Sequence, residues 1–147
     1  METQSSIKKI VPKKIKLDFK DSKYATGRRK RSIAKVWVKK GSGNIHVNGK
    51  IMNNYFKRPV HQIIVMRPLE ISNIATSYDV RASVKGGGLS GQAGAIIHGL
   101  SRALVLHDET LKTVLKKEKM TTRDSRVVER KKYGHKKARR SFQFSKR

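Results

Sequence analysis

Alternation of apolar and polar residues predicts two β-strands in this chain. Residues 33–38 read I-A-K-V-W-V, a run of β-branched and aromatic residues that favours a strand. Residues 78–84 place Tyr, Val, Ala and Val at every second position, with Asp, Arg and Ser between them. Because neighbouring side chains on a strand point to opposite faces, the second segment should bury one face and carry Arg81 on the other.

A turn cluster follows the first of these strands. Residues 41–44 read G-S-G-N, and residues 45–47 supply a short apolar segment after them. The dipeptide Asn48-Gly49 comes next and tolerates positive φ at both central positions of a turn. We therefore expect residues 33–38 and 45–47 to form a hairpin.

Helical spacing of apolar residues predicts a helix from Gln92 to about residue 106. The apolar positions that recur along it are Ile96, Ile97, Leu100, Ala103 and Leu104. His98, Ser101 and Arg102 fall mostly on the other side of this helix. One face should therefore pack on the core while the other meets solvent.

A second, shorter helix is predicted from Asp108 to about residue 118. Asp108 is a favourable N-cap, and Glu109 lies in the first turn, where a negative charge complements the helix dipole. The apolar side chains that this helix would bury are Leu111, Val114 and Leu115. Upstream, residues 61–77 fit a strand or a helix and are interrupted by Pro68. Together, the elements predict an α+β sandwich.

The charge of the chain is concentrated toward its ends. Lys and Arg number 36 against 10 acidic residues, a formal net charge of +26. The net charge is +8 over residues 23–40, +7 over the much longer segment 41–128 and +8 over 129–147. A compact chain with this charge needs a polyanionic partner to relieve its self-repulsion.

Apolar residues and charge together suggest how the chain is divided. Most Ile, Leu and Val lie within residues 23–128, which we expect to form one globular domain. Residues 129–147 have no apolar periodicity and cannot repay the entropy of folding, so we expect a basic tail that orders on its partner. Residues 1–22 are expected to form an N-terminal extension.

Composition also excludes several classes of protein. No apolar run approaches the roughly 20 residues that cross a bilayer. The chain has no cysteine, which excludes disulfides and thiolate zinc sites. Its five histidines show no i,i+4 pair, and its carboxylates and serines show neither a paired acid and base nor a Ser-His-Asp set. We therefore expect no catalytic residues, no bound metal and no cofactor, and residues 1–22 do not read as a signal or transit peptide.

Gly86, Gly88 and Gly91 fit the pattern G-x-G-x-x-G between a predicted strand and a predicted helix. Dinucleotide-binding folds have this pattern but also need an acidic residue at the end of a following strand, and Asp108 follows a helix. A Walker loop would need Lys where Gln92 stands. Two interpretations stay open: a turn whose backbone N–H groups receive an RNA phosphate, and a purely structural turn.

Two basic runs are typical of segments that follow a nucleic-acid backbone. The first is G-R-R-K-R at residues 27–31, before the first predicted strand, and the second occupies residues 129–140. Arginine guanidinium groups match phosphate oxygens with two parallel hydrogen bonds. Tyr133, Phe142 and Phe144 accompany the second run and offer surfaces on which bases stack. The runs predict a nucleic-acid-binding protein.

Four motifs, in this order, resemble the family of small-subunit ribosomal protein S-nine. They are Y-A-T-G-R-R-K at 24–30, V-K-G-G-G-L-S-G-Q-A-G-A at 84–95, T-R-D-S-R-V-V-E-R-K-K at 122–132 and Q-F-S-K-R at 143–147. The resemblance spans about residues 23–147 and leaves 1–22 outside. It implies an α+β (two-layer α/β) fold of the ribosomal S-five domain 2 type, with a long basic C-terminal tail. The implied function is that of a structural constituent of the head of the small ribosomal subunit.

The resemblance also implies which residues bind RNA. Together with the basic runs, it assigns small-subunit rRNA to Arg28, Arg29, Lys30, Arg31, Lys85, Gly87, Gly88, Gln92, Arg123, Arg126, Arg130, Lys131, Lys132, Lys136, Lys137, Arg139 and Arg140. It assigns the anticodon stem-loop of the P-site tRNA to Ser145, Lys146 and Arg147. Neighbouring proteins of the subunit head are further implied partners, whereas no membrane and no small-molecule substrate is expected.

The family pattern leans toward ribosomes of bacterial type. The implied location is the ribosome, in the bacterial cytoplasm or the mitochondrial matrix, with a plastid as the weaker fit. Charge alone also fits a free RNA chaperone or a nonspecific nucleic-acid-binding protein, because phosphate attraction needs no sequence recognition. That is the main alternative, ahead of an enzyme.

Overall fold

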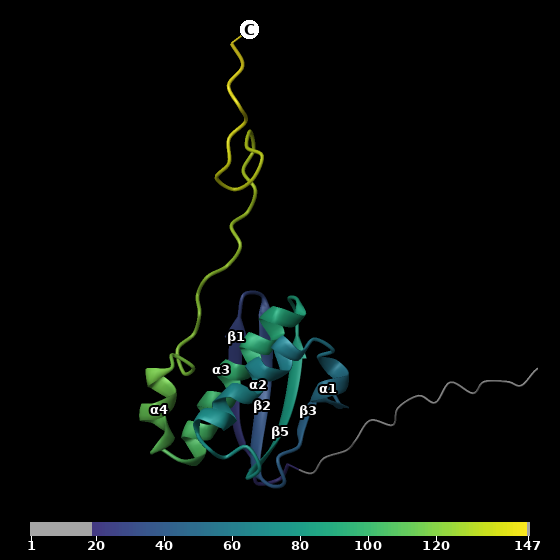
Figure 1. Ribbon diagram of the computed structural model, residues 1–147, viewed down its shortest axis with the longest axis vertical. Helices are drawn as coiled ribbons and strands as arrows, with labels where there is room; N and C mark the ends of the chain where they lie inside the picture. The colour runs from purple at the N-terminus through teal and green to yellow at the C-terminus, as the bar shows by residue number, and fades with distance from the viewer. Residues whose placement is uncertain (1–18, 147) are drawn as a thin grey trace, which may run out of the picture.

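The computed structural model describes residues 19–146, which form an α+β sandwich of two layers (Figure 1). The strands are β1 (Lys23–Arg29), β2 (Ser32–Lys40), β3 (Ile45–Val47), β4 (Lys50–Ile51) and β5 (Tyr78–Lys85). The helices are α1 (Met52–Tyr55), α2 (Pro59–Ile71), α3 (Leu89–His107) and α4 (Leu111–Lys117). This architecture confirms the predicted fold class and is consistent with a fold of the ribosomal S-five domain 2 type.

The strands form one sheet in the order β1-β2-β5-β3-β4. β2 pairs with β1 and β5 in antiparallel register, and β3 runs parallel to β5. The hairpin predicted between residues 33–38 and 45–47 is therefore wrong, because β5 lies between the two strands. The Asp79 carboxylate at the start of β5 accepts hydrogen bonds from the backbone N–H groups of Ser42 (3.0 Å) and Asn44 (2.8 Å). These bonds hold the turn cluster across the end of β5.

The dipeptide Asn48-Gly49 forms a tight turn, but it joins β3 to β4. Val47 pairs with Lys50 across the turn, and φ is 51° at Asn48 and 78° at Gly49. Positive φ at both central residues gives a hairpin whose twist matches that of the sheet. The Asn48 side chain also donates to the carbonyl of Val84 (3.0 Å) and accepts from its N–H (2.8 Å). The short hairpin is thereby fastened to β5.

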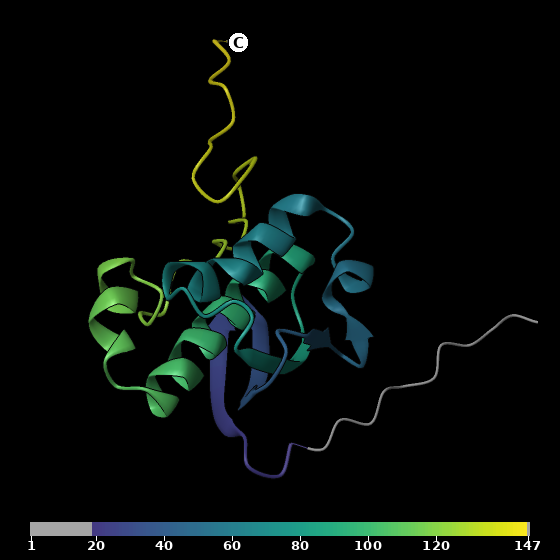
Figure 2. The ribbon, with the colours of Figure 1, turned by 60° about the horizontal axis from the view of Figure 1, so that its bottom comes forward.

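Helices α2 and α3 cover one face of the sheet (Figure 2). The alternation predicted for β5 is confirmed, since Tyr78, Val80, Ala82 and Val84 are all buried. Helix α3 is also confirmed, and it begins at Leu89, before the predicted start. Ser101 is fully buried rather than on the exposed side. The reason is that α3 packs against both the sheet and α2, so most of its circumference is covered.

Helix α2 resolves most of the ambiguous segment 61–77, and the helix continues through Pro68. Pro59 is its first residue, where the missing N–H of proline costs nothing. Pro68 lies near the end of the helix and removes one backbone hydrogen bond. Val65 and Leu69 are fully buried, and this burial outweighs the lost bond.

Asp108 does not cap the last helix, contrary to the prediction. Helix α4 begins at Leu111, and the Asp108 carboxylate instead accepts a hydrogen bond of 2.7 Å from the Tyr78 hydroxyl. Burial of that hydroxyl and its bond to Asp108 raise the pKa of Tyr78 to about 12. Leu115 is buried as predicted, but Val114 is 42% exposed, because so short a helix buries only a narrow stripe.

The described chain forms no helix or strand after α4, and Met120 is its last buried residue. Residues 121–128 still lie against the body, near β1 and α3. Residues 129–146, the tail, extend away from it, interrupted by a loop in which His135 and Ser141 form an isolated β-bridge (Figure 1). The predicted division of the chain at residues 22 and 128 stays a prediction, and residues 1–18 lie outside the described part. None of the helices described here is long and apolar enough to cross a membrane.

Candidate nucleic-acid interface

The first basic run forms the end of β1 and the turn into β2. It was predicted to precede the first strand, and β1 itself was not predicted. Lys30 lies in the turn with a φ of 50°, and both Lys30 and Arg31 are exposed. The run is therefore held by a strand on each side, which limits the entropy lost when its side chains bind a partner.

Arg28 and Arg29 occupy consecutive positions of β1 and so point to opposite faces of the sheet. Arg29 lies across Gly94 of α3, and its guanidinium is 3.4 Å from the carboxylate of Asp124. Arg126 donates to the same carboxylate through two side-chain bonds of 3.1 and 3.0 Å. These bonds, together with the nearby Arg29, hold the pKa of Asp124 at about 2. The ionised carboxylate fastens the segment before the tail to β1.

A pocket of about 400 Å³ opens between α3 and the segment that follows α4. Its charged lining comprises Arg28, Arg29, Arg67, Arg126, Lys119, Glu118 and Asp124. Glu118 accepts a hydrogen bond of 3.0 Å from Arg67, and Asp124 is paired as described above. The lining therefore keeps an excess of positive charge, which suits a phosphate.

His98 joins three segments at this pocket. Its Nδ1 accepts a hydrogen bond of 3.1 Å from the backbone N–H of Arg28, and its ring is also hydrogen-bonded to the backbone of Thr121. Burial lowers the pKa of His98, and the charges of Arg102 and Arg123 lower it further. The neutral form is the one that can accept from Arg28, so His98 is a neutral link between β1, α3 and the segment that follows α4. No pattern in the sequence indicated this role.

The glycine-rich segment forms a compact turn from β5 into α3. Gly87 has a φ of 62°, and a Cβ there would overlap the Ser32 hydroxyl, whereas the space around Gly88 is open. Ser32 Oγ donates to the carbonyl of Gly86 (3.0 Å), and Gln92 Nε2 donates to the same carbonyl (3.2 Å). These contacts give the segment a structural role, while the binding of RNA by Gly87, Gly88 and Gln92 stays a prediction.

The structure brings two of the predicted sites together. A Cβ at Gly86 would lie 2.6 Å from the carbonyl oxygen of Arg31. The glycine turn (residues 86–91) and the basic turn (residues 28–31) are therefore neighbours. Lys85 is exposed at the end of β5 and pairs with Ile33 of β2. The basic turn, Lys85 and the glycine turn therefore form one end of the body, which we call the basic end, and the tail extends past it (Figure 1).

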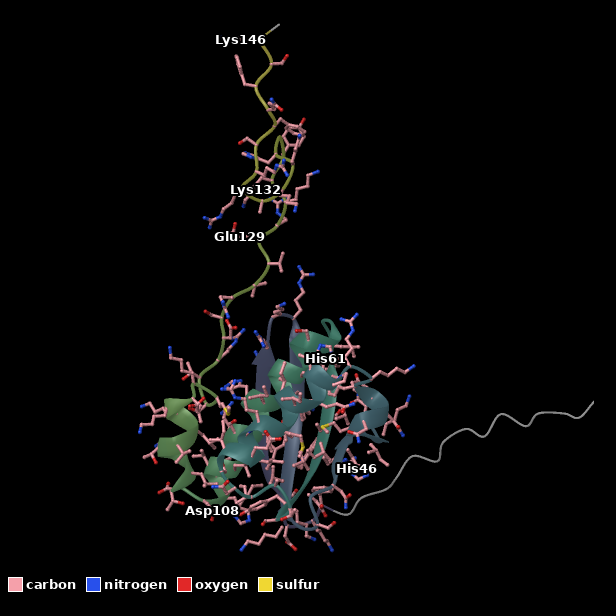
Figure 3. The ribbon with its side chains drawn as sticks, viewed as in Figure 1. His46, His61, Asp108, Glu129, Lys132 and Lys146 are labelled. Carbon is pink, nitrogen blue, oxygen red and sulfur yellow. The ribbon has the colours of Figure 1, made fainter. Side chains whose placement is uncertain are left out.

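The tail carries the remaining predicted residues at its surface (Figure 3). Its exposed cations are Arg130, Lys131, Lys132, Lys136, Lys137, Arg140 and Lys146, and Arg123 is exposed in the segment just before the tail. Arg139 is exposed too but donates twice to Glu129, at 3.0 and 2.7 Å. Tyr133 and Phe144 are 103% and 86% exposed, so these rings are free to stack on bases. Ser145 is exposed as well, and Arg147 lies outside the described residues.

Within residues 19–146, no group of three or more His, Cys, Asp or Glu side chains could hold a metal ion. Two of the acidic side chains near the basic runs, Asp124 and Glu129, are paired with arginines. The arginine, lysine and backbone N–H groups at this surface are groups that bind anions such as phosphate.

The chain matches a known family of ribosomal proteins. A family model described as ribosomal protein S9/S16 matches residues 27–147. The matched segment begins within the first basic run, includes the glycine turn and α3, and ends with the tail. Such a protein has a structural, non-enzymatic role in the small ribosomal subunit. The chain belongs to the ribosomal protein S9/S16 family.

Proposed function

We propose that this chain is an S9-type protein whose basic end and tail bind small-subunit rRNA, and whose last residues contact the P-site tRNA. Membership of the family already assigns it to the ribosome. The observation that supports the finer proposal is the position of the charge: the basic end and the tail lie on the same side of the body (Figure 1). A single RNA surface could therefore be met by both.

Phosphate contacts account best for the proposed rRNA binding. Lys30, Arg31 and Lys85 are exposed at the basic end, and a rigid turn between two strands suits a backbone that is followed without reading bases. The tail adds further cations that are exposed along an extended chain. Arg126 and Arg139 are engaged by Asp124 and Glu129, so they would orient the tail or exchange partners when RNA binds.

The proposed tRNA contact rests on reach. Residues 129–146, if fully extended, would reach roughly 60 Å from the body. Ser145 and Lys146 are exposed at the end of this segment, and Arg147 follows them in the sequence. Their charges suit contacts with the phosphates of an anticodon stem-loop, which require no base recognition.

We further propose a ribosome of bacterial type, in the bacterial cytoplasm or the mitochondrial matrix, with the neighbouring head proteins as additional partners. The Q-F-S-K-R terminus and the three upstream motifs support this assignment. A free RNA chaperone remains the alternative, because the net charge of +26 would by itself attract any RNA.

Co-sedimentation at high salt separates the proposal from this alternative. Small subunits that contain the tagged chain are pelleted through a sucrose cushion at increasing KCl concentrations. We expect the chain to stay with the subunits at KCl concentrations that wash off nonspecific basic proteins. The reason is that specific contacts with the particle do not depend on counterion release alone. A chain that leaves the particle along the same salt curve as a polylysine control would be a nonspecific binder.

Deleting Lys146 and Arg147 should weaken tRNA retention while leaving assembly intact. Charge-assisted contacts contribute on the order of 1–3 kcal/mol each, and less where solvent screens them, so we expect roughly tenfold faster tRNA dissociation at low salt. Dissociation of P-site tRNA from purified subunits at two salt concentrations measures this. The control variant Lys136→Gln/Lys137→Gln also removes two tail charges, but earlier in the tail. Equal off-rates and equal salt slopes for the truncated and full-length chains would show that the terminus does not hold tRNA.

A further inference from the structure

The face of the sheet that α2 and α3 leave open carries a row of side chains in register. Tyr24 on β1 pairs with Trp37 on β2, and Trp37 pairs with Arg81 on β5. Arg81 pairs in turn with His46 on β3, and His46 with Ile51 on β4. Residues directly opposite on paired strands share one face of a sheet, so these five side chains form a continuous row, the outer row.

Nothing in the described fold packs over the outer row. Both long helices lie on the other face (Figures 1 and 2). Tyr24 is 44% exposed and Ile51 is 50% exposed, although both are large apolar side chains. These two side chains do not belong to the core, which is formed by residues on the opposite face of the strands, such as Ala25 and Val36.

Three members of the outer row form a layered arrangement of flat groups. The ring centroids of Tyr24 and Trp37 are 5.3 Å apart with an interplanar angle of 40°. The guanidinium carbon of Arg81 lies 5.6 Å from the centre of the Trp37 ring. An aromatic pair next to a guanidinium plane presents the kind of surface on which nucleobases stack.

The charge around the outer row is strongly positive. The basic side chains on the outward positions of the strands are Arg28, Lys35, Lys39, Arg81 and Lys85. The acidic side chain on the outward positions of the described strands is Asp79, and its carboxylate already accepts hydrogen bonds from the 42–44 loop. On the described strands the outward face therefore carries an excess of positive charge, which complements an anion.

We propose that the outer row is a second RNA-binding surface that stacks unpaired bases of a single-stranded RNA segment on Tyr24 and Trp37. The flanking lysines Lys35 and Lys39 hold the phosphates of the same segment. The inference extends the proposed rRNA binding and rests on it only for the identity of the RNA as ribosomal. This surface differs from the basic end, which contacts phosphates and has no aromatic ring.

An acidic protein segment would satisfy the charge of this face but not its aromatic character. Carboxylates pair with lysine and arginine, and they gain nothing from a Tyr-Trp pair held beside a guanidinium. A duplex RNA would satisfy the charge too, but its bases are stacked on each other and cannot reach the rings. Of these three partners, single-stranded RNA is the one that uses both the cations and the rings.

Trp37 is the only tryptophan of the chain, so its fluorescence reports directly on this surface. The full-length chain is titrated with a short single-stranded oligoadenylate, an abasic oligonucleotide of the same length, an RNA duplex and polyglutamate. Anisotropy of labelled ligands measures binding separately from Trp37 emission. We expect oligoadenylate to quench Trp37 strongly at saturation, and the other three ligands to bind with little quenching.

Variants of the row test the contribution of each plane. Tyr24→Leu keeps an apolar side chain and Arg81→Lys keeps the charge, but each variant removes a flat group. Each should weaken oligoadenylate binding about tenfold, equivalent to about 1.4 kcal/mol. Lys112→Gln, on exposed α4, is the control variant and should behave like the unchanged chain. Circular dichroism of each variant confirms that the sheet is intact.

Two results would overturn the proposal. One is unchanged Trp37 emission at oligoadenylate concentrations that saturate the anisotropy signal. The other is equal quenching by the abasic oligonucleotide or by polyglutamate, which would show that the face recognises charge or an acidic protein. Failure of the proposed rRNA binding has a different signature, namely loss of co-sedimentation with small subunits, and leaves the quenching by oligoadenylate unaffected.

Discussion

Replacing Gly27 by valine is expected to destabilise the body strongly. A Cβ at this position would overlap the carbonyl oxygen of Ala95 and the backbone nitrogen of Gly99, both in α3. Overpacking a core against side chains typically costs 1–3 kcal/mol. Backbone atoms of a helix cannot rotate away, so we expect the free energy of unfolding to fall by more than about 3 kcal/mol, a large share of the roughly 5–15 kcal/mol typical of a domain.

Urea denaturation of the full-length chain, followed by circular dichroism, measures this loss. Gly27→Ala introduces the same Cβ with the smallest side chain and keeps the test quantitative if the valine variant does not fold. Gly88→Ala is the control, because the space around Gly88 is open and its φ is −101°. A Gly27→Ala chain as stable as the Gly88→Ala chain would mean that β1 and α3 do not approach so closely.

The close approach at Gly27 connects the fold to the proposed interface. Gly99 lies opposite, and a Cβ there would meet Val36 and the backbone of Gly27. Arg102 of α3 reinforces the contact by donating a hydrogen bond of 2.8 Å to the carbonyl of Thr26. The strand that carries Arg28 and Arg29 is thus fixed against the longest helix, and the basic end inherits its rigidity.

The same glycine explains why β1 could not be predicted from the sequence. Its buried positions are Ala25 and Gly27, whose small side chains give almost no apolar signal, while the larger Tyr24 faces outward. β5 was predicted correctly because Tyr78, Val80 and their successors bury a full apolar face. Periodicity predicts a strand only where its buried side chains are large enough to stand out as apolar. Where a strand packs closely against the backbone of a helix, its buried residues must be small, and the pattern is lost.

The strand order and the contacts between side chains could not be predicted from the sequence either. The expected hairpin assumed that strands adjacent in sequence pair with each other, whereas the Asp79 carboxylate anchors the 42–44 loop across β5. The basic runs and the exposed tail could be read from charge alone. The outer row could not, because Tyr24, Trp37 and Arg81 are far apart in the sequence and meet only through the register of β1, β2 and β5.

Neutralising the basic turn should weaken rRNA binding and flatten its dependence on salt. The variant Arg28→Gln/Lys30→Gln/Arg31→Gln removes three charges and leaves Arg29 in place, because Arg29 also pairs with Asp124. Each phosphate contact contributes about 0.7–0.9 to the slope of log K against log salt concentration. If all three side chains contact phosphates, the slope should therefore fall by about 2–3, with roughly hundredfold weaker binding at low salt.

The matched variant Lys112→Gln/Lys116→Gln/Lys117→Gln removes the same charge from exposed positions of α4. Filter binding of both variants to small-subunit rRNA over a range of KCl concentrations compares them directly. A protein that docks through its basic end loses affinity and slope in the first variant only, since α4 lies outside the proposed interface. A protein that is attracted by net charge loses the same in both, because each variant lowers the formal charge of +26 by three. Equal losses would thus contradict an oriented interface and favour the nonspecific RNA binder, whereas unequal losses require that position, and not only charge, determines how the chain meets RNA.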